Sequence, residues 1–135
     1  MAPMRPNRLN LSKPVIATVS GTAVVGGMEL AFWEYIRVME KSVYMGVYCR
    51  CWGIPLIVEG PVRLQRLVGE GRAMDLILTG LKVDVEDALQ IGLRDYVVLE
   101  GQGRDKAEDL ANSLLQFSKS CIKADRWSVR NQHGL

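Results

Sequence analysis

Short β-branched runs alternate along the chain with longer runs whose apolar residues have helical spacing. The run at residues 14–20 lies between a proline and a glycine and predicts a buried strand. Similar patterns predict strands at residues 43–48 and 96–99 and helices at residues 28–39, 62–68, 72–79, 84–92 and 106–127, with a second helix beginning near residues 118–120. This order predicts an α/β fold in which helices flank a small sheet.

Several of these helices carry boundary signals. Pro61 suits the first turn of the helix at 62–68, and Gly80 stands at the C-cap position after Thr79. Asp84 followed by Asp87 is a variant of the capping box. The segment 28–39 has no breaker and is apolar on nearly every side, which predicts a helix inside a larger body.

The domain organisation predicted is simple. The 135 residues amount to one domain, and 48% of them are hydrophobic, enough for a real core. Residues 1–12 are polar, contain two prolines and predict an irregular basic arm, so residues 13–135 form the single domain. No apolar run approaches the roughly 20 residues that a membrane span requires. The arm has no apolar stretch after its cations and is not a secretory signal.

Charge and cysteine usage narrow the functional class further. The net charge is +2, and cations alternate with carboxylates, which argues against nucleic-acid binding. Cys49 and Cys51 are too close for an unstrained disulfide, and with Cys121 their number is odd. The thiols are therefore expected to be reduced, as in a cytoplasmic protein. We expect no metal site, because no second Cys or His pair has ligand spacing, and the one histidine, His133, is interpreted as a tail residue.

The turn from Gly21 to Leu30 carries the candidate chemistry. A strand ends at Gly21, and the chain enters the next helix at Gly26 and Gly27. The first amides of a helix lack internal partners and lie at the positive end of its dipole. Two glycines would let a ligand approach those amides, where an oxyanion forming on a thioester would be stabilised.

Two other interpretations of this turn need weighing. Gly21 and Gly26 have the spacing of a phosphate-binding P-loop, but Gly27 stands where the lysine is needed and Met28 where the hydroxyl is needed. That motif therefore fails where its chemistry matters. Glycines that only let a helix cross close to a strand remain an equally good explanation of the spacing.

Glu29 lies in the first turn of this apolar helix. No Lys or Arg stands three or four residues away to pair with it. A carboxylate there is stabilised by the helix dipole, which is a structural reason for its presence. A carboxylate in apolar surroundings is also a suitable general acid or base, and the two explanations stay open.

These residues resemble the enoyl-CoA hydratase/isomerase (crotonase) family. The run KPVIATVSGTAVVGGMELA at residues 13–31 is similar to that family's K-P-V-I-A-A-V-x-G-x-A-x-G-G-G-x-E-L-A. Further matches are RLQRLVG at 63–69, RAMDLILTG at 72–80 and DALQIGL at 87–93. The resemblance covers residues 13–99, with a looser match in the helix that follows.

The resemblance implies a truncated crotonase-like fold of stacked β-β-α units and a coenzyme A thioester as substrate or ligand, with no resident cofactor. It implies that Gly26 supplies one oxyanion amide and that Glu29 is the first of the two glutamates that hydratases use as general acid and base. The residues that it implies line or support the substrate pocket are Val24, Val25, Gly27 and Met28.

The chain also departs from the family pattern. The second hydratase glutamate falls at Cys49, and a thiol does not simply replace a carboxylate. The first glycine of the triple is Val25, and the family's G-G-T stretch becomes Glu59-Gly-Pro61. The resemblance also implies that the N-terminal half of the family domain, with the other oxyanion amide, is absent, and that the C-terminal helices are shortened after Arg126.

Two functional hypotheses follow. The first is an enzyme of the hydratase/isomerase type that handles acyl-CoA thioesters with weakened or altered catalysis. The second is a non-catalytic binding or assembly protein derived from the same family. Because removing part of a fold exposes surface that was buried, we expect a homo-oligomer, a dimer or a trimer.

Overall fold

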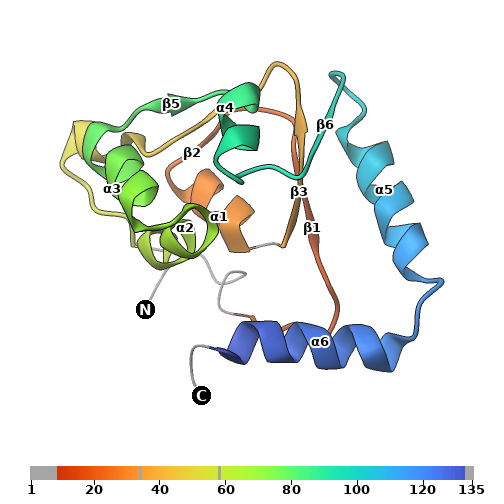
Figure 1. Cartoon of the computed structure of the whole chain (residues 1–135). Helices are drawn as coiled ribbons and strands as arrows, with labels where there is room; N and C mark the ends of the chain where they lie inside the picture. Colours follow the sequence, from red (N-terminus) through yellow and green to blue (C-terminus); the bar gives the residue numbers. More distant parts are fainter. Residues whose placement is uncertain (1–8, 34, 58, 133–135) are drawn as a thin grey trace.

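Two three-stranded sheets form the centre of the protein in a computed structural model that describes residues 9–33, 35–57 and 59–132 (Figure 1). The strands are β1 (Ile16–Val19), β2 (Ala23–Val24), β3 (Ile36–Glu40), β4 (Met45–Gly46), β5 (Lys82–Val83) and β6 (Tyr96–Val98). The α-helices are α1 (Gly26–Trp33), α2 (Gly60–Val68), α3 (Glu70–Thr79), α4 (Val85–Gln90), α5 (Gly103–Leu114) and α6 (Lys119–Asn131), and a 3₁₀ helix, η2, spans Tyr48–Trp52.

The strand pairing shows the β-β-α repeat that the sequence predicted. One sheet has the order β1-β3-β6 with parallel pairs throughout, and the other has the order β2-β4-β5. The stretch β1-β2-α1 therefore gives one strand to each sheet before its helix. The next stretch, β3-β4, does the same: β3 pairs with β1 and β4 with β2, both in parallel. The predicted α/β class and the stacking of these units are confirmed.

The helices cover the sheets unequally. The apolar core gathers α1, α2, α3 and α4 around the second sheet, with Met28, Met45 and Leu64 almost fully buried. On the other side, α5 packs along β1 and β3. Figure 1 shows α6 apart from this body, crossing below the start of β1. No residue of α6 is buried.

The predicted helix at residues 28–39 is wrong in its second half. α1 ends at Trp33, and Ile36–Glu40 forms β3, the central strand of the first sheet. β3 is buried on both faces, and its polar residues Arg37 and Glu40 stand three positions apart, so its periodicity fits a helix as well as a strand. The β-branched Ile36 and Val38 were the signal for a strand.

Other helix and strand boundaries also differ from those predicted. Only Met45–Gly46 of the predicted strand at 43–48 is extended, and Tyr48–Trp52 is a 3₁₀ helix. The two-residue strands β2 and β5 were not predicted, because so short a strand has no period to detect. The predicted helix at 106–127 is broken after Leu114, and α6 begins at Lys119 as the alternative start proposed.

The predicted helix boundaries at three positions are confirmed. Pro61 lies in the first turn of α2, and Gly80 caps α3 with φ +65°. The Asp84 side chain accepts a hydrogen bond from the Asp87 amide at 2.9 Å. No helix among the described residues is long and apolar enough to cross a membrane. Most of the predicted arm at 1–12, and His133, lie outside the described residues.

A hydrogen bond to the Glu40 carboxylate joins the start of α5 to the first sheet. It is buried at the end of β3, and its Oε1 accepts a hydrogen bond from the Gly103 amide, the first of α5, at 3.1 Å. A Cβ on Gly103 would lie 2.9 Å from the same oxygen, so a larger residue there would displace the Glu40 carboxyl group. A hydrogen bond from the Gly101 backbone, followed by smaller contributions from Gly103 and Ser20, holds the pKa of Glu40 below its ordinary value despite burial.

This lowered pKa predicts acid sensitivity. A carboxyl whose folded pKa lies below its unfolded pKa of about 4.3 stabilises the fold above that pH. The stabilisation is lost as pH falls through the folded pKa. We expect Glu40→Gln to lower the free energy of unfolding at pH 7 and to flatten its dependence on pH in the acid range. Urea unfolding at a series of pH values measures both, and an unchanged pH dependence would contradict this role.

Candidate functional site

The turn from β2 into α1 contains most of the site residues that were predicted from the sequence. Val24 ends β2, and Gly26 is the first residue of α1. The Val25 carbonyl accepts the Glu29 amide at 3.0 Å and so starts the helix. The turn therefore brings the predicted residues from Val24 to Glu29 together as one short segment.

Val25 has an unusual backbone. Its φ is +51°, in the left-handed region that β-branched residues rarely adopt. The sequence comparison placed the first glycine of the family's triple at this position, and glycine would adopt this conformation without a steric penalty. The turn has thus kept its shape although the residue has changed. Val25 packs its side chain against the core, which compensates for part of the strain.

The start of α1 is open to a ligand. Gly26 is half-buried and Gly27 is exposed, and a Cβ added to Gly27 would meet nothing within 4 Å. Beside it runs a cavity of about 480 Å³ along residues 15–23 and part of α1, which we call the edge cavity. Met28 points the other way and is buried in the core. An anionic group in the edge cavity has a side-chain-free path toward the helix start.

Glu29 faces a second helix start. Its side chain is 2% exposed, and Oε1 accepts a hydrogen bond from the Gly60 amide, the first of α2, at 2.8 Å. A Cβ on Gly60 would lie 2.5 Å from this oxygen and 2.7 Å from Glu29 Cγ. The carboxylate therefore lies at the positive ends of two helices, α1 and α2, and links them across 31 residues of sequence.

We expect Gly60→Ala to lower the free energy of unfolding by about 2–3 kcal/mol. The methyl group would displace a buried side chain and break its hydrogen bond. Gly27→Ala is the matched control: it adds the same methyl in open space and should raise stability by about 0.5–1 kcal/mol through helix propensity. Urea unfolding measures both, and equal stabilities of Gly60→Ala and wild type would show that the contact is loose.

Glu59, which precedes this glycine, is the second strained residue of the site. Its φ of +68° places it in the left-handed region as the N-cap of α2. Its carboxylate pairs with Arg63 at 2.6 Å on the surface of that helix. The sequence comparison placed a family glycine here as well. Val25 and Glu59 are the non-glycine residues with positive φ among the described residues.

Glu59→Gly is expected to stabilise the protein. Relief of the left-handed conformation contributes about 1–2 kcal/mol. Loss of the surface ion pair with Arg63 removes only about 0.3–0.5 kcal/mol of that gain. Glu59→Ala is the control, because it loses the same ion pair and keeps the strain, so it should be slightly less stable than wild type. Thermal unfolding that ranks alanine above glycine would overturn the strain argument.

Cys49 lies in η2 and is 1% exposed. It belongs to the same buried apolar cluster as Met28, so its thiol faces the core. All three cysteines have free thiols, and Cys51 and Cys121 are exposed. The described residues contain no group of three or more Asp, Glu, His or Cys side chains that could hold a metal ion.

The comparisons with known proteins agree with this geometry. The model of the enoyl-CoA hydratase/isomerase family matches residues 7–133. Enoyl-CoA hydratase EchA19 of Mycobacterium tuberculosis is 34% identical over 120 residues, which are 89% of this chain and 45% of that protein. The short-chain-enoyl-CoA hydratase of Clostridium acetobutylicum is 34% identical over 119 residues, 88% of this chain and 46% of that protein.

Solved structures give the same result in three dimensions. An enoyl-CoA hydratase of M. tuberculosis H37Rv superposes with a TM-score of 0.90 at 27% identity, over 95% of this chain and 51% of that one. A Thermobifida fusca protein assigned as an enoyl-CoA hydratase, in complex with acetoacetyl-CoA, gives 0.85 at 25% identity, over 90% and 48%. The fold is that of the crotonases, and the chain belongs to the enoyl-CoA hydratase/isomerase family. It spans about half the length of these relatives.

Sequence reasoning missed the partner of Glu29. The absence of a cation within one helical turn of Glu29 showed only that its partner had to come from elsewhere. The signal for Gly60 was a glycine directly before Pro61, a position where a helix start accepts a close neighbour. Glu40 and Gly103 repeat the same arrangement and were not singled out.

Proposed function

We propose that this chain binds the thioester group of an acyl-CoA at the start of α1 and acts on it as a weakened relative of the enoyl-CoA hydratases and isomerases. The observation that carries the proposal is the open start of α1 at Gly27, which follows Gly26 directly and lines the edge cavity. The Gly26 amide is the proposed donor to the thioester oxygen. Family membership and the acetoacetyl-CoA complex of the T. fusca relative support a thioester as the ligand.

The proposed roles of the neighbouring residues follow from their places. Val24 and Val25 shape the turn, Met28 anchors α1 in the core, and Gly27 leaves the approach free. Glu29 is the proposed general acid or base. The hydrogen bond that it accepts from the Gly60 amide fixes the orientation of the carboxylate, and burial keeps the carboxylate away from bulk water.

Catalysis is expected to be weak for two reasons. The side chain at position 49 is a thiol, so Cys49 offers no second carboxylate for a two-glutamate mechanism. One backbone donor to an oxyanion contributes about 2.7–4 kcal/mol in the transition state, so a site with a single donor lacks roughly that amount of stabilisation. A second donor to the oxyanion is not identified among the described residues.

The Glu29–Gly60 hydrogen bond also favours the second candidate function, a non-catalytic binding or assembly protein. Through this contact Glu29 has a structural role, the joining of α1 to α2, that does not depend on a substrate. A chain that kept the core and lost the reaction would keep this glutamate for stability alone. The enzyme candidate requires Glu29 to transfer a proton, whereas the binding or assembly candidate requires only the hydrogen bond from Gly60.

The variant Glu29→Gln distinguishes the two candidate functions. The amide oxygen of glutamine still accepts the hydrogen bond from Gly60, so the fold is retained, but the side chain no longer transfers a proton. Under the enzyme proposal, wild type hydrates a short enoyl-CoA slowly and the variant does not, while both are stabilised by acetyl-CoA in a thermal titration. Loss of absorbance of the conjugated thioester measures the rate. Equal rates in both proteins would exclude Glu29 as the acid or base, and absence of any thermal shift would reject thioester binding.

A further inference from the structure

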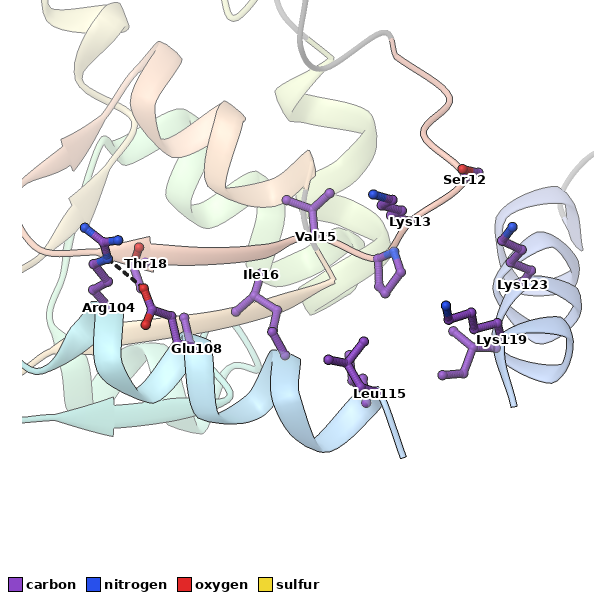
Figure 2. A pocket seen from close by; sticks show the side chains of 15 residues that line it. Ser12, Lys13, Val15, Ile16, Thr18, Arg104, Glu108, Leu115, Lys119 and Lys123 are labelled. Carbon is purple, nitrogen blue, oxygen red and sulfur yellow. Dashed lines mark hydrogen bonds and ion pairs between the residues drawn. The ribbon is translucent and has the colours of Figure 1, made fainter. Parts of the chain in front are cut away.

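A groove runs along one face of β1, between α5 and α6 (Figure 2). We call it the basic groove, and its volume of about 690 Å³ is typical of sites for small molecules. Ile16 and Thr18 line it, whereas Ala17 between them does not. Since side chains of a strand alternate between its faces, the groove lies against a face of β1 and not along its edge. The strand face and the two helices form its walls.

The two ends of the basic groove differ in charge. At one end Arg104 and Glu108 pair at 2.7 Å, so their charges cancel. At the other end Figure 2 shows Lys13, which precedes β1, and Lys119 and Lys123 of α6. None of these three lysines forms an ion pair with a carboxylate of the described residues. One end of the groove is therefore neutral and the other is cationic.

Apolar side chains line the groove between its two ends. Ile16 belongs to the strand and Ile122 to α6, while Ala107, Ala111 and Leu114 belong to α5. The three α5 residues are spaced by four and three positions, so they lie on one face of the helix and follow the groove. A hydrocarbon chain placed along this path would be removed from water.

The orientation of α6 is the reverse of that of an ordinary amphipathic helix. Its cations are spaced by four, three and four residues and form one stripe: Lys119, Lys123, Arg126 and Arg130. The stripe faces the body of the protein, because its first two members line the groove and Arg126 lies over the Tyr35 ring, 5.6 Å from its centroid. Trp127, in contrast, is 61% exposed.

This inward stripe calls for an anion. Like charges three or four residues apart on a helix repel each other, and Asp125, the one carboxylate of α6, stands outside the spacing of the stripe. An inorganic anion would compensate the lysines but leave the apolar walls in water. A neutral hydrocarbon would cover those walls but leave the lysines uncompensated. A ligand that has both an anionic group and an apolar chain satisfies the whole groove.

We propose that the basic groove binds an amphiphile with a single hydrocarbon chain and an anionic head group, a carboxylate or a phosphate. The head group lies among Lys13, Lys119 and Lys123 and accepts charge-assisted hydrogen bonds from them. The chain runs along the apolar face of α5 toward the neutral end of the groove. No residue of the turn at 24–29 lines this groove, so the site is separate from the proposed thioester site.

Isothermal titration calorimetry with probes below their micelle concentrations tests the proposal. Decanoate and decyl phosphate carry the two anionic head groups, decanol is the chain without a charge, and inorganic phosphate is the head group without a chain. We expect at least one anionic amphiphile to bind about tenfold or more tightly than decanol and inorganic phosphate. The tighter of the two identifies the head group. Equal affinities for decanol and both anionic amphiphiles, or no binding of either amphiphile, would overturn the proposal.

The variant Lys119→Gln with Lys123→Gln tests the cationic end. Its affinity for the anionic amphiphiles should fall about tenfold or more, while its affinity for decanol stays unchanged. Lys41→Gln with Arg66→Gln is the matched control, because it removes two exposed cations that do not line the groove. The control should bind as wild type does. An equal loss in both double variants would show that net charge, and not the groove, attracts the ligand.

The variant Ala111→Trp tests the apolar path. Ala111 is exposed on α5, so the larger side chain enters the groove and not the core. The variant should keep the native circular dichroism and bind neither amphiphile, whereas Asn112→Trp, one residue further and outside the groove, should bind both. Undiminished binding by Ala111→Trp would contradict the assignment. Sedimentation velocity without amphiphile examines the other occupant: a wild-type dimer that Ala111→Trp dissociates would assign the groove to a second copy of the chain and overturn the proposal.

Discussion

The contact between a buried glutamate and the first amide of a distant helix is the interaction on which the rest of the structure depends. Glu29 accepts from Gly60 and joins α1 to α2, and Glu40 accepts from Gly103 and joins β3 to α5. In each pair a buried carboxylate is compensated by a helix start and its dipole. In each pair the helix begins with a glycine because a Cβ would collide with the carboxyl group. These two contacts fix the helices on either side of the first sheet.

The two strained residues stand at the starts of the same two helices. Val25 leads into α1 and Glu59 into α2, and the chain has a positive φ at both positions. Glycine would meet that demand without strain. The surrounding contacts determine the conformation strongly enough that a valine and a glutamate are held there. Strain of this kind persists only where the rest of the structure imposes it.

Much of the fold and part of the site could be predicted from the sequence. The strand at residues 14–20, the helix caps at Gly80 and Asp84 and the β-β-α class followed from local chemistry and family motifs. β3 could not be separated from α1, because its two polar residues, Arg37 and Glu40, stand three positions apart, a spacing that fits a helix and not the alternation of a strand. The partner of Glu29 could not be predicted, because a contact across 31 residues leaves no local pattern. The sequence identified Gly26 and Gly27, but the open space before Gly27 depends on how β1 and α1 pack.

The open start of α1 follows from the place of the first β-β-α unit in the stack. The parallel pairing of β1 with β3 and of β2 with β4 places this unit at the end of the stack of described strands. The edge cavity is lined by Gly27 and by residues 15–23 of this unit. A unit inside such a stack would have its edge paired and its helix start covered. Among the described residues, the position of this unit at the end therefore leaves the start of α1 uncovered at Gly27, where helix amides can bind an anion.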